Sequence, residues 1–494
     1  QKRLAASRRL RLPAVQAQGF SGDVQSINDL LENSVASTEY PSVIFGQFDP
    51  AFLTLPEEVL ITVMAHHQKY FYLRDTRGRL APYFLAVIDS DGDRTGLIRR
   101  NHERVLEARF RDAQFFWEAD RRARLESRLP ALAGVVFAEG LGTYEHKTRR
   151  LEQLATWLAD NVSVLGRRAD REALQLAARL SKCDLTTQLV GEFPELQGIA
   201  GGLYARDQGE PEEVSQAIYE HYRPEGPDKP IPTSSEGALL ALADKLDSIA
   251  GFFLAGLGPT GSRDPLGIRR AGTGVVRIVL EGRARLSLPD AVMEALRLQF
   301  MTASRQGKPI ISYGIQDIVN FLAERARYLF REVKRFPDDE INAVFAAGAP
   351  DLVDAEARLA ALHHLRPDAH FEPLSVAFKR IRNILEQAGD GARWASRSVE
   401  PRLLDAGAER NLFDAFSQLR PRVADLRSRN EYAQALRLMA SLRPQVDRFF
   451  DGVLVMTDNP AVRDNRLALL AHILSEFSAI ADFAEIVPTQ PVAA

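Results

Sequence analysis

The chain has 494 residues, with 63 Lys and Arg against 66 Asp and Glu, so its formal net charge is −3. Its composition, 45% hydrophobic and 26% charged, is ordinary for a folded globular protein and excludes a disordered chain, a collagen-like repeat and a disulfide scaffold. At roughly 100–200 residues per domain, this length predicts about three domains, each able to bury a core.

The N-terminal segment, residues 1–22, carries Lys and Arg but no acid. We expect it to form the basic face of a helix rather than a targeting peptide. The lone Cys183 cannot form an intrachain disulfide, so we expect a buried, inert thiol in the middle of a helix and a cytoplasmic location. No stretch approaches the ~18 uninterrupted apolar residues of a membrane helix, so a membrane is not an expected partner.

Residues 25–90 mix helix and strand patterns. Pro56 suits the first turn of a helix, and the turn-prone segment 75–78 separates two apolar runs. These patterns predict a short amphipathic helix at 25–40, a strand at 42–48, a helix at 55–70 and a hairpin at 71–90.

From residue 100 onward the pattern is mainly helical. The stretch 207–228 has seven acids against one Arg, which predicts a solvated acidic loop or helix edge. Pro460 follows Asn459, which predicts an N-cap and a first helical position there. The other expected segments are a long helical run at 145–188, helices at 237–256 and 268–279, a linker with one helix at 282–310, and helices from 314 to the C-terminus.

The histidines do not form a known metal motif. His102-Glu103 is followed at the second ligand position by Leu106, so the zinc-protease helix is absent. No His-Asp dipeptide occurs, which removes the central ligand pair of a metal-dependent HD phosphohydrolase. We expect His146 and His221 to be surface or capping residues, and we expect no metal site in this chain.

A Gly-rich loop is the one candidate phosphate site. Residues 256–261 match G-x-G-x-x-G, but they follow a helix rather than a strand, and Ser262-Arg263 replaces the Walker Lys-Ser/Thr pair. The loop amides and the guanidinium groups of Arg263, Arg269 and Arg270 could hold a phosphate. A helix C-cap with solvated arginines is an equally good interpretation. No nucleophile motif is present, and we expect no catalytic residue.

The chain contains local clusters of basic residues that its near-neutral total charge does not reveal. Lys379, Arg380 and Arg382 form one cluster, and residues 411–448 carry seven cations against four acids. A surface that binds a nucleic-acid backbone needs local charge of this kind rather than a basic whole. Only 9 of the 63 cations are Lys, which leaves 54 Arg, the fork-shaped phosphate donor, although a GC-rich genome is the simpler cause.

Long strings of the sequence resemble the beta subunit of the bacterial two-subunit glycyl-tRNA synthetase. They include KCDLTTQLVGEFPELQGIAGGLYARDQGE and GPTGSRDPLGIRRAGTGVVRI, in matching order and spacing. The resemblance covers essentially the whole chain, but family members begin with a further segment, so we expect this sequence to lack the family's N-terminal region. The matching strings lie at 48–60, 69–75, 101–120, 182–210, 217–224, 241–253, 258–278, 377–385 and 432–470.

The resemblance implies a mainly α fold with a small α+β N-terminal part. A degenerate HD-like helical domain follows, in which Lys182-Cys183-Asp184 replaces the metal-binding pair. A helical-bundle anticodon-binding domain, similar to that of arginyl-tRNA synthetase, completes the chain. The expected boundaries are 1–115 for the α+β part, 116–280 for the HD-like domain, 281–312 for a linker and 313–494 for the anticodon-binding domain.

The resemblance also implies a function. The alpha subunit carries the catalytic site and uses ATP with Mg to activate glycine, while the beta subunit binds tRNA(Gly), is required for charging, and binds no cofactor itself. The family assembles as an α2β2 heterotetramer. Two alternatives stay open, an HD-type phosphohydrolase relative and a non-catalytic RNA- or protein-binding paralogue. The expected tRNA contacts are Arg263, Arg269, Arg270, Lys379, Arg380, Arg382, Arg422, Arg427, Arg429 and Arg437.

Overall fold

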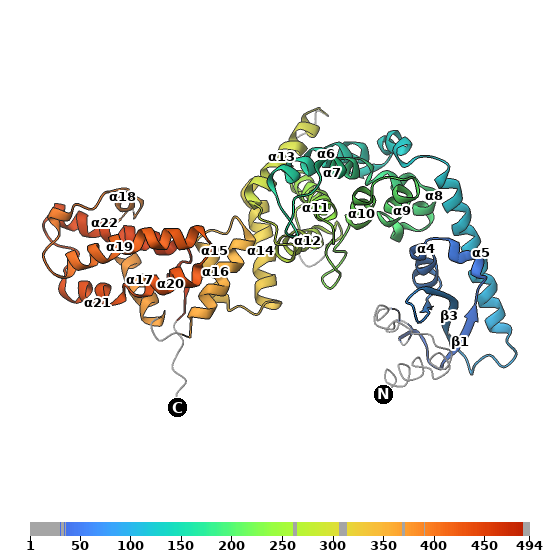
Figure 1. The fold of residues 1–494 in the computed structure, drawn as a ribbon, viewed down its shortest axis with the longest axis horizontal. Coiled ribbons are helices and arrows are strands. Elements are labelled where there is room, and N and C mark those ends of the chain that lie inside the picture. Colours follow the sequence, from blue (N-terminus) through green and yellow to red (C-terminus); the bar gives the residue numbers. More distant parts are fainter. Residues whose placement is uncertain are drawn as a thin grey trace. The chain divides into compact units, whose positions relative to one another are not determined.

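A computed structural model provides the structure of the chain (Figure 1). It describes residues 36–259, 264–305, 314–367, 371–389 and 391–487, together with Leu30 and Ser34. The described part is mainly α-helical, and its strands form one three-stranded and one two-stranded sheet. This confirms the predicted fold class. The basic segment 1–22 and most of the helix expected at 25–40 lie outside the described residues.

The chain divides into two compact units. Unit 1 contains residues 1–159, 169–223 and 232–244, and unit 2 contains residues 160–168, 224–231 and 245–494. The division falls within a single helix, α11 (Ser235–Leu254), which contributes to both units. The four boundaries expected from the sequence stay a prediction.

The N-terminal sheet is antiparallel, with strand order β1-β3-β2. The hairpin predicted at 71–90 is confirmed, because Gly78 N donates to Asp75 O at 2.9 Å between its two strands. Phe71 and Leu85 lie in the buried cluster on one side of this sheet. The elements are β1 (Pro41–Gln47), α4 (Glu57–Ile61), a π-helical turn (Thr62–His67), β2 (Tyr70–Arg74) and β3 (Leu80–Asp89).

The helix α5 (Leu97–Arg121) connects the sheet to the other helices of unit 1 (Figure 1). Its residues Leu106, Phe110, Ala113 and Trp117 are buried at intervals of three and four, which is the spacing of one helix face. Phe110 packs edge-on against Phe48, with 5.0 Å between the ring centroids. The far end of α5 contacts α8 (Gln188–Glu192).

The long helical run predicted at 145–188 is wrong, because the chain leaves the helix after Asn161. Leu165 and Gly166 adopt left-handed backbone conformations, with φ of 55° and 77°. A new helix then starts where the Asp170 side chain accepts from the amides of its first turn. The further helices are α6 (Tyr144–Asn161), α7 (Arg171–Leu180), α9 (Ile199–Asp207) and α10 (Glu212–Glu220), with a two-stranded ribbon of β4 (Val136–Ala138) and β5 (Gly142–Thr143).

The long elements of unit 2 within the described residues are helices, joined by loops and turns. Asn459 caps its last long helix through amides of Ala461 and Val462, and Pro460 takes the first helical position, as predicted. None of the described helices of the chain is long and apolar enough to cross a membrane. The helices are α12 (Ile268–Glu281), α13 (Leu288–Arg305), α14 (Ile315–Glu332), α15 (Asp338–Ala346), α16 (Leu352–Leu365), α17 (Phe371–Gln387), α18 (Gly391–Ala395), α19 (Ala408–Ser428), α20 (Tyr432–Ala440), α21 (Arg443–Gly452) and α22 (Pro460–Ser478).

We expect Gly46→Ala to destabilise the N-terminal sheet. Gly46 pairs with Phe84 across β1 and β3, and a Cβ at Gly46 would overlap the buried Phe84 ring, which stacks on Tyr70. The expected loss is about 1–3 kcal/mol of unfolding free energy, measured by urea unfolding. The control is Gly134→Ala, whose Cβ would meet no atom within 4 Å. An unchanged unfolding midpoint for G46A would contradict this packing.

Candidate functional site

A buried cluster of charged side chains lies in unit 1, where the sequence has no His-Asp pair. The Lys182 side chain is 1% exposed, and its Nζ lies 3.0 Å from Asp244 Oδ1 and 2.8 Å from His221 Nε2. Lys147 Nζ reaches the same Asp244 oxygen at 3.1 Å. The Tyr222 ring centroid lies 3.9 Å from the Lys182 ammonium. The His221 nitrogen and the Asp244 oxygen, both possible metal ligands, therefore contact an ammonium group of the chain itself.

The electrostatics of this cluster follow from its burial. Burial lowers the pKa of Lys182 to about 8 and raises the pKa of Asp184 to about 6. Asp184 Oδ2 accepts from the amides of Gly198 at 2.5 Å and Gly201 at 3.1 Å, so its partners are backbone donors. Asp184 is thus held in place from within the fold.

The neighbouring Cys183 is buried, as expected, and burial raises the pKa of its thiol to about 12. It lies in a short 3₁₀ turn after α7 rather than in the middle of a helix. His146 meets Thr143 at the start of α6, and His221 is the C-cap residue of α10. Within the described ranges, no group of three His, Cys, Asp or Glu side chains is arranged to hold a metal ion.

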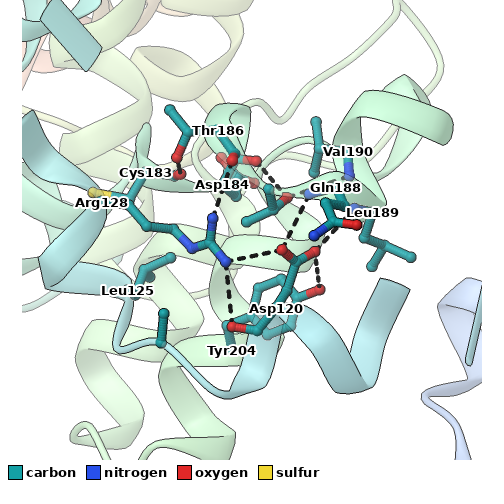
Figure 2. Close-up of polar contacts among 12 residues, drawn as sticks. Asp120, Leu125, Arg128, Cys183, Asp184, Thr186, Gln188, Leu189, Val190 and Tyr204 are labelled. Carbon is teal, nitrogen blue, oxygen red and sulfur yellow. Dashed lines mark hydrogen bonds and ion pairs between the residues drawn. The ribbon is translucent and has the colours of Figure 1, made fainter. Parts of the chain in front are cut away.

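A second network surrounds Asp120 at the end of α5 (Figure 2). The Asp120 carboxylate accepts from the amides of Gln188 at 3.1 Å and Leu189 at 2.9 Å, which are the first two residues of α8. Tyr204 and Arg128 donate to the same carboxylate at 3.2 and 2.8 Å. Asp120 therefore caps α8 from a distant part of the sequence. No local pattern marks this role, because the capped amides lie 68 and 69 residues away.

Most acids of the stretch 207–228 are solvated, as predicted, since Asp207, Glu212, Glu213, Glu225 and Asp228 are exposed. Glu220 is fully buried and accepts from Thr233 and Ser234 as well as from Arg223 at 2.9 Å. Other acids of this stretch pair with arginines of unit 1, at 2.6 Å for Asp207–Arg121, 2.7 Å for Glu210–Arg124 and 2.7 Å for Glu212–Arg206. Glu220 is therefore the buried exception in a stretch whose other acids are exposed or partly exposed.

The Gly-rich loop ends α11 in the way that the C-cap interpretation expects. Gly256 has φ of 75°, and the amides of Gly256 and Leu257 donate back into the last helical turn. Arg263 lies outside the described residues. The Asp264 carboxylate accepts from the amides of Arg269 at 3.2 Å and Arg270 at 3.1 Å, so the chain's own carboxylate holds two amides at the start of α12. Contact of these arginines with tRNA stays a prediction.

The predicted cations of the C-terminal helices fall into two sets. The first set is held by partners in the same unit. Arg382 donates to Asp482 at 2.6 Å and to Glu386 at 2.9 Å. Arg427 pairs with Glu476 and Arg429 with Asp425, both at 2.8 Å, and Lys379 Nζ donates to the Ile486 carbonyl at 3.4 Å.

The second set is available to an external partner. Arg422 on α19 and Arg437 on α20 are exposed, and neither makes an ion pair or side-chain hydrogen bond with the described residues. Arg380 on α17 is also exposed and lies over the Phe450 ring, 4.3 Å from its centroid. Guanidinium groups of this second set can contact phosphates without first breaking an internal ion pair.

Two family models match the chain. The model described as the glycyl-tRNA synthetase beta subunit matches residues 9–346. The model described as the DALR anticodon binding domain matches residues 374–482, which contain Arg380, Arg422 and Arg437.

Curated relatives share this similarity over most of the chain. The sequence is 46% identical over 459 residues to the glycine–tRNA ligase beta subunit of Acidobacterium capsulatum, covering 91% of this chain and 64% of the relative. The proteins of the same name from Syntrophus aciditrophicus and Myxococcus xanthus are 40% and 41% identical, covering 95% and 96% of this chain and 66% and 67% of the relatives. The chain thus spans about two thirds of the length of these relatives.

We expect Asp184→Asn to weaken the dependence of stability on pH. The pKa of Asp184 is about 6 in the fold and 3.8 ordinarily, so the folded chain keeps a proton that the unfolded chain has lost. The retained proton adds to the free energy of unfolding at pH values below the ordinary pKa. This contribution decreases by about 1.4 kcal/mol per pH unit between the two pKa values and is lost as the pH rises through about 6. The variant keeps an acceptor for Gly198 and Gly201 but has no proton to lose.

Urea unfolding at about pH 4.5 and about pH 6.5 measures this difference, because the other titrating groups contribute equally to both proteins. The free energy of D184N should fall less, or rise more, between these values than that of the wild type. Equal changes in the two proteins would show that Asp184 is already ionised at the lower pH.

Proposed function

The chain belongs to the glycyl-tRNA synthetase beta-subunit family, and from this premise we propose that it is the tRNA-binding beta subunit of a glycine–tRNA ligase. In this proposal, an alpha subunit carries the catalytic site and uses ATP with Mg²⁺ to activate glycine. This chain binds tRNA(Gly) and enables charging, contributes no catalytic residue, and assembles with the alpha subunit as an α2β2 heterotetramer in the cytoplasm.

One observation carries the tRNA-binding part of the proposal. The helices matched by the anticodon-binding model are those that expose Arg422 and Arg437 without acidic partners among the described residues. A phosphate bound there would replace water around these cations rather than a carboxylate. Because phosphate contacts release counterions from RNA, a few such arginines give binding that weakens steeply with salt.

A phosphohydrolase has no such support. The His221 nitrogen and the Asp244 oxygen contact Lys182, and both curated names and family models point to tRNA charging. A paralogue that binds RNA without supporting charging would share the same arginine surface, so a charging assay separates it from the proposed subunit.

We expect the double variant Arg422→Ala, Arg437→Ala to bind tRNA(Gly) more weakly and with a shallower salt dependence. Each lost phosphate contact should reduce the log–log salt slope by about 0.7–0.9. Fluorescence anisotropy of labelled tRNA(Gly) across a salt series measures both quantities.

The matched control is the double variant Arg382→Ala, Arg427→Ala. It removes the same charge from α17 and α19 of the same unit, but its guanidinium groups are held by Asp482, Glu386 and Glu476. We expect this control to lower thermal stability and to leave the salt slope near the wild-type value. Equal salt slopes for the two double variants would contradict the assignment of Arg422 and Arg437.

A further inference from the structure

Arg380 differs from the other predicted cations in what it touches. Its guanidinium carbon lies 4.3 Å from the centroid of the Phe450 ring. Arg380 belongs to α17 and Phe450 to α21, so the ring holds the guanidinium from a neighbouring helix. Arg380 is exposed, and among the described residues no carboxylate accepts a hydrogen bond from it. One face of the planar cation is covered by an aromatic ring, and its N–H groups have no acceptor among the described residues.

Several other arginines of the chain that lie over aromatic rings also pair with acids. Each of these guanidinium groups contacts both an aromatic ring and a carboxylate. Examples are Arg74 over Tyr72 with Glu57, Arg121 over Trp117 with Asp207, Arg223 over Tyr219 with Glu220, and Arg410 over Phe413 with Asp414. Among the described residues, Arg380 has the ring contact without an acid, as do Arg327 over Phe345 and Arg393 over Trp394. Its ring is the nearest of the three, at 4.3 Å against 4.7 and 4.8 Å.

An exposed aliphatic side chain also lies near Arg380 in the chain. Val376 precedes it by one turn on α17 and is 54% exposed. Residues four apart are neighbours on a helix surface, so Val376 and Arg380 share one face of α17. Phe450 is itself partly exposed beneath it. The result is a flat cation between an aromatic ring and solvent, with an aliphatic side chain on the same helix face.

We propose that Arg380 and Phe450 form a stacking site for an unpaired base of a single-stranded RNA loop. The base stacks on the open face of the guanidinium, whose N–H groups donate to the base edge or to the adjacent phosphate. A paired base in a helix has both faces covered by its neighbours, whereas a loop base can turn out and stack on an arginine plane or an aromatic ring. The proposal rests on the proposed tRNA binding and names unpaired loop bases as its target at this position.

Two substitutions separate the contribution of the positive charge of Arg380 from that of the planar groups at this site. Arg380→Lys keeps the positive charge but loses the plane, and Phe450→Leu keeps an apolar side chain but loses the ring. We expect either variant to bind tRNA(Gly) about five- to a hundredfold more weakly, which is the contribution of one stacked base, with the wild-type salt slope. The matched control is Arg410→Lys, whose guanidinium lies 5.9 Å from the Phe413 ring and pairs with Asp414. Its affinity should equal that of the wild type.

A second measurement reports stacking directly. 2-Aminopurine is placed at each unpaired position of the tRNA(Gly) anticodon loop in turn, and its fluorescence is followed on binding the full chain. At one position or more, the wild-type chain should change the fluorescence and F450L should not. Wild-type affinity in both R380K and F450L, or no response at any loop position, would overturn the proposal. Failure of the wild-type chain to bind tRNA(Gly) at all would contradict the proposed function, and this site with it.

Discussion

Within each of its two units, this protein depends on pairs between arginines and carboxylates. In unit 1, Arg128 and the amides of α8 share the Asp120 carboxylate (Figure 2). In unit 2, Arg277 is only 9% exposed, donates to Glu281, and also donates to three backbone carbonyls. Arg466 joins α22 to Glu409 on α19 at 2.7 Å. Buried carboxylates of this kind are stable only with their donors in place, because an uncompensated buried charge costs several kcal/mol.

This pairing also determines which arginines remain available for the proposed contact with RNA. The total charge is near neutral, but the charges are not evenly distributed. Acids of the same unit pair with many of the arginines, while a few other arginines are exposed. Arg382 and Arg427 are held in the first way, whereas Arg380, Arg422 and Arg437 are left without an acid among the described residues. The buried centre of unit 1 follows the same rule with lysine, since Lys182 and Lys147 both contact Asp244. Cations that pair with acids thus stabilise the fold, whereas the exposed arginines without such pairs are those proposed to contact RNA.

Local rules of the sequence predicted the elements whose determinants lie close together in the chain. The hairpin around Asp75 and the cap at Asn459 need only a few neighbouring residues, and both were correct. The break after Asn161 was missed although Gly166 and the capping Asp170 mark it locally, and the left-handed conformation of Leu165 is one that its residue type does not favour. The apolar periodicity on either side of the break gave no sign of it.

The candidate site was predictable only in part, because many of its contacts join residues that lie far apart in the sequence. The sequence shows where arginines gather, but an arginine is free or held according to acids that the fold brings near. Glu476 lies 49 residues from Arg427, and Asp482 lies 100 residues from Arg382. The Arg382–Glu386 and Arg429–Asp425 pairs, each four residues apart, do follow from spacing alone. The stacking of Arg380 on Phe450 likewise depends on the packing of α17 against α21.

The central claim is that this chain enables the charging of tRNA(Gly). The most direct measurement is the rate of glycyl-tRNA(Gly) formation from labelled glycine and ATP by a purified alpha subunit, with and without this chain. The account predicts little product from either protein alone and a large, saturable gain when both are present. No gain on adding the chain, under conditions where it binds tRNA(Gly), would contradict the claim and favour an RNA-binding protein without a role in charging.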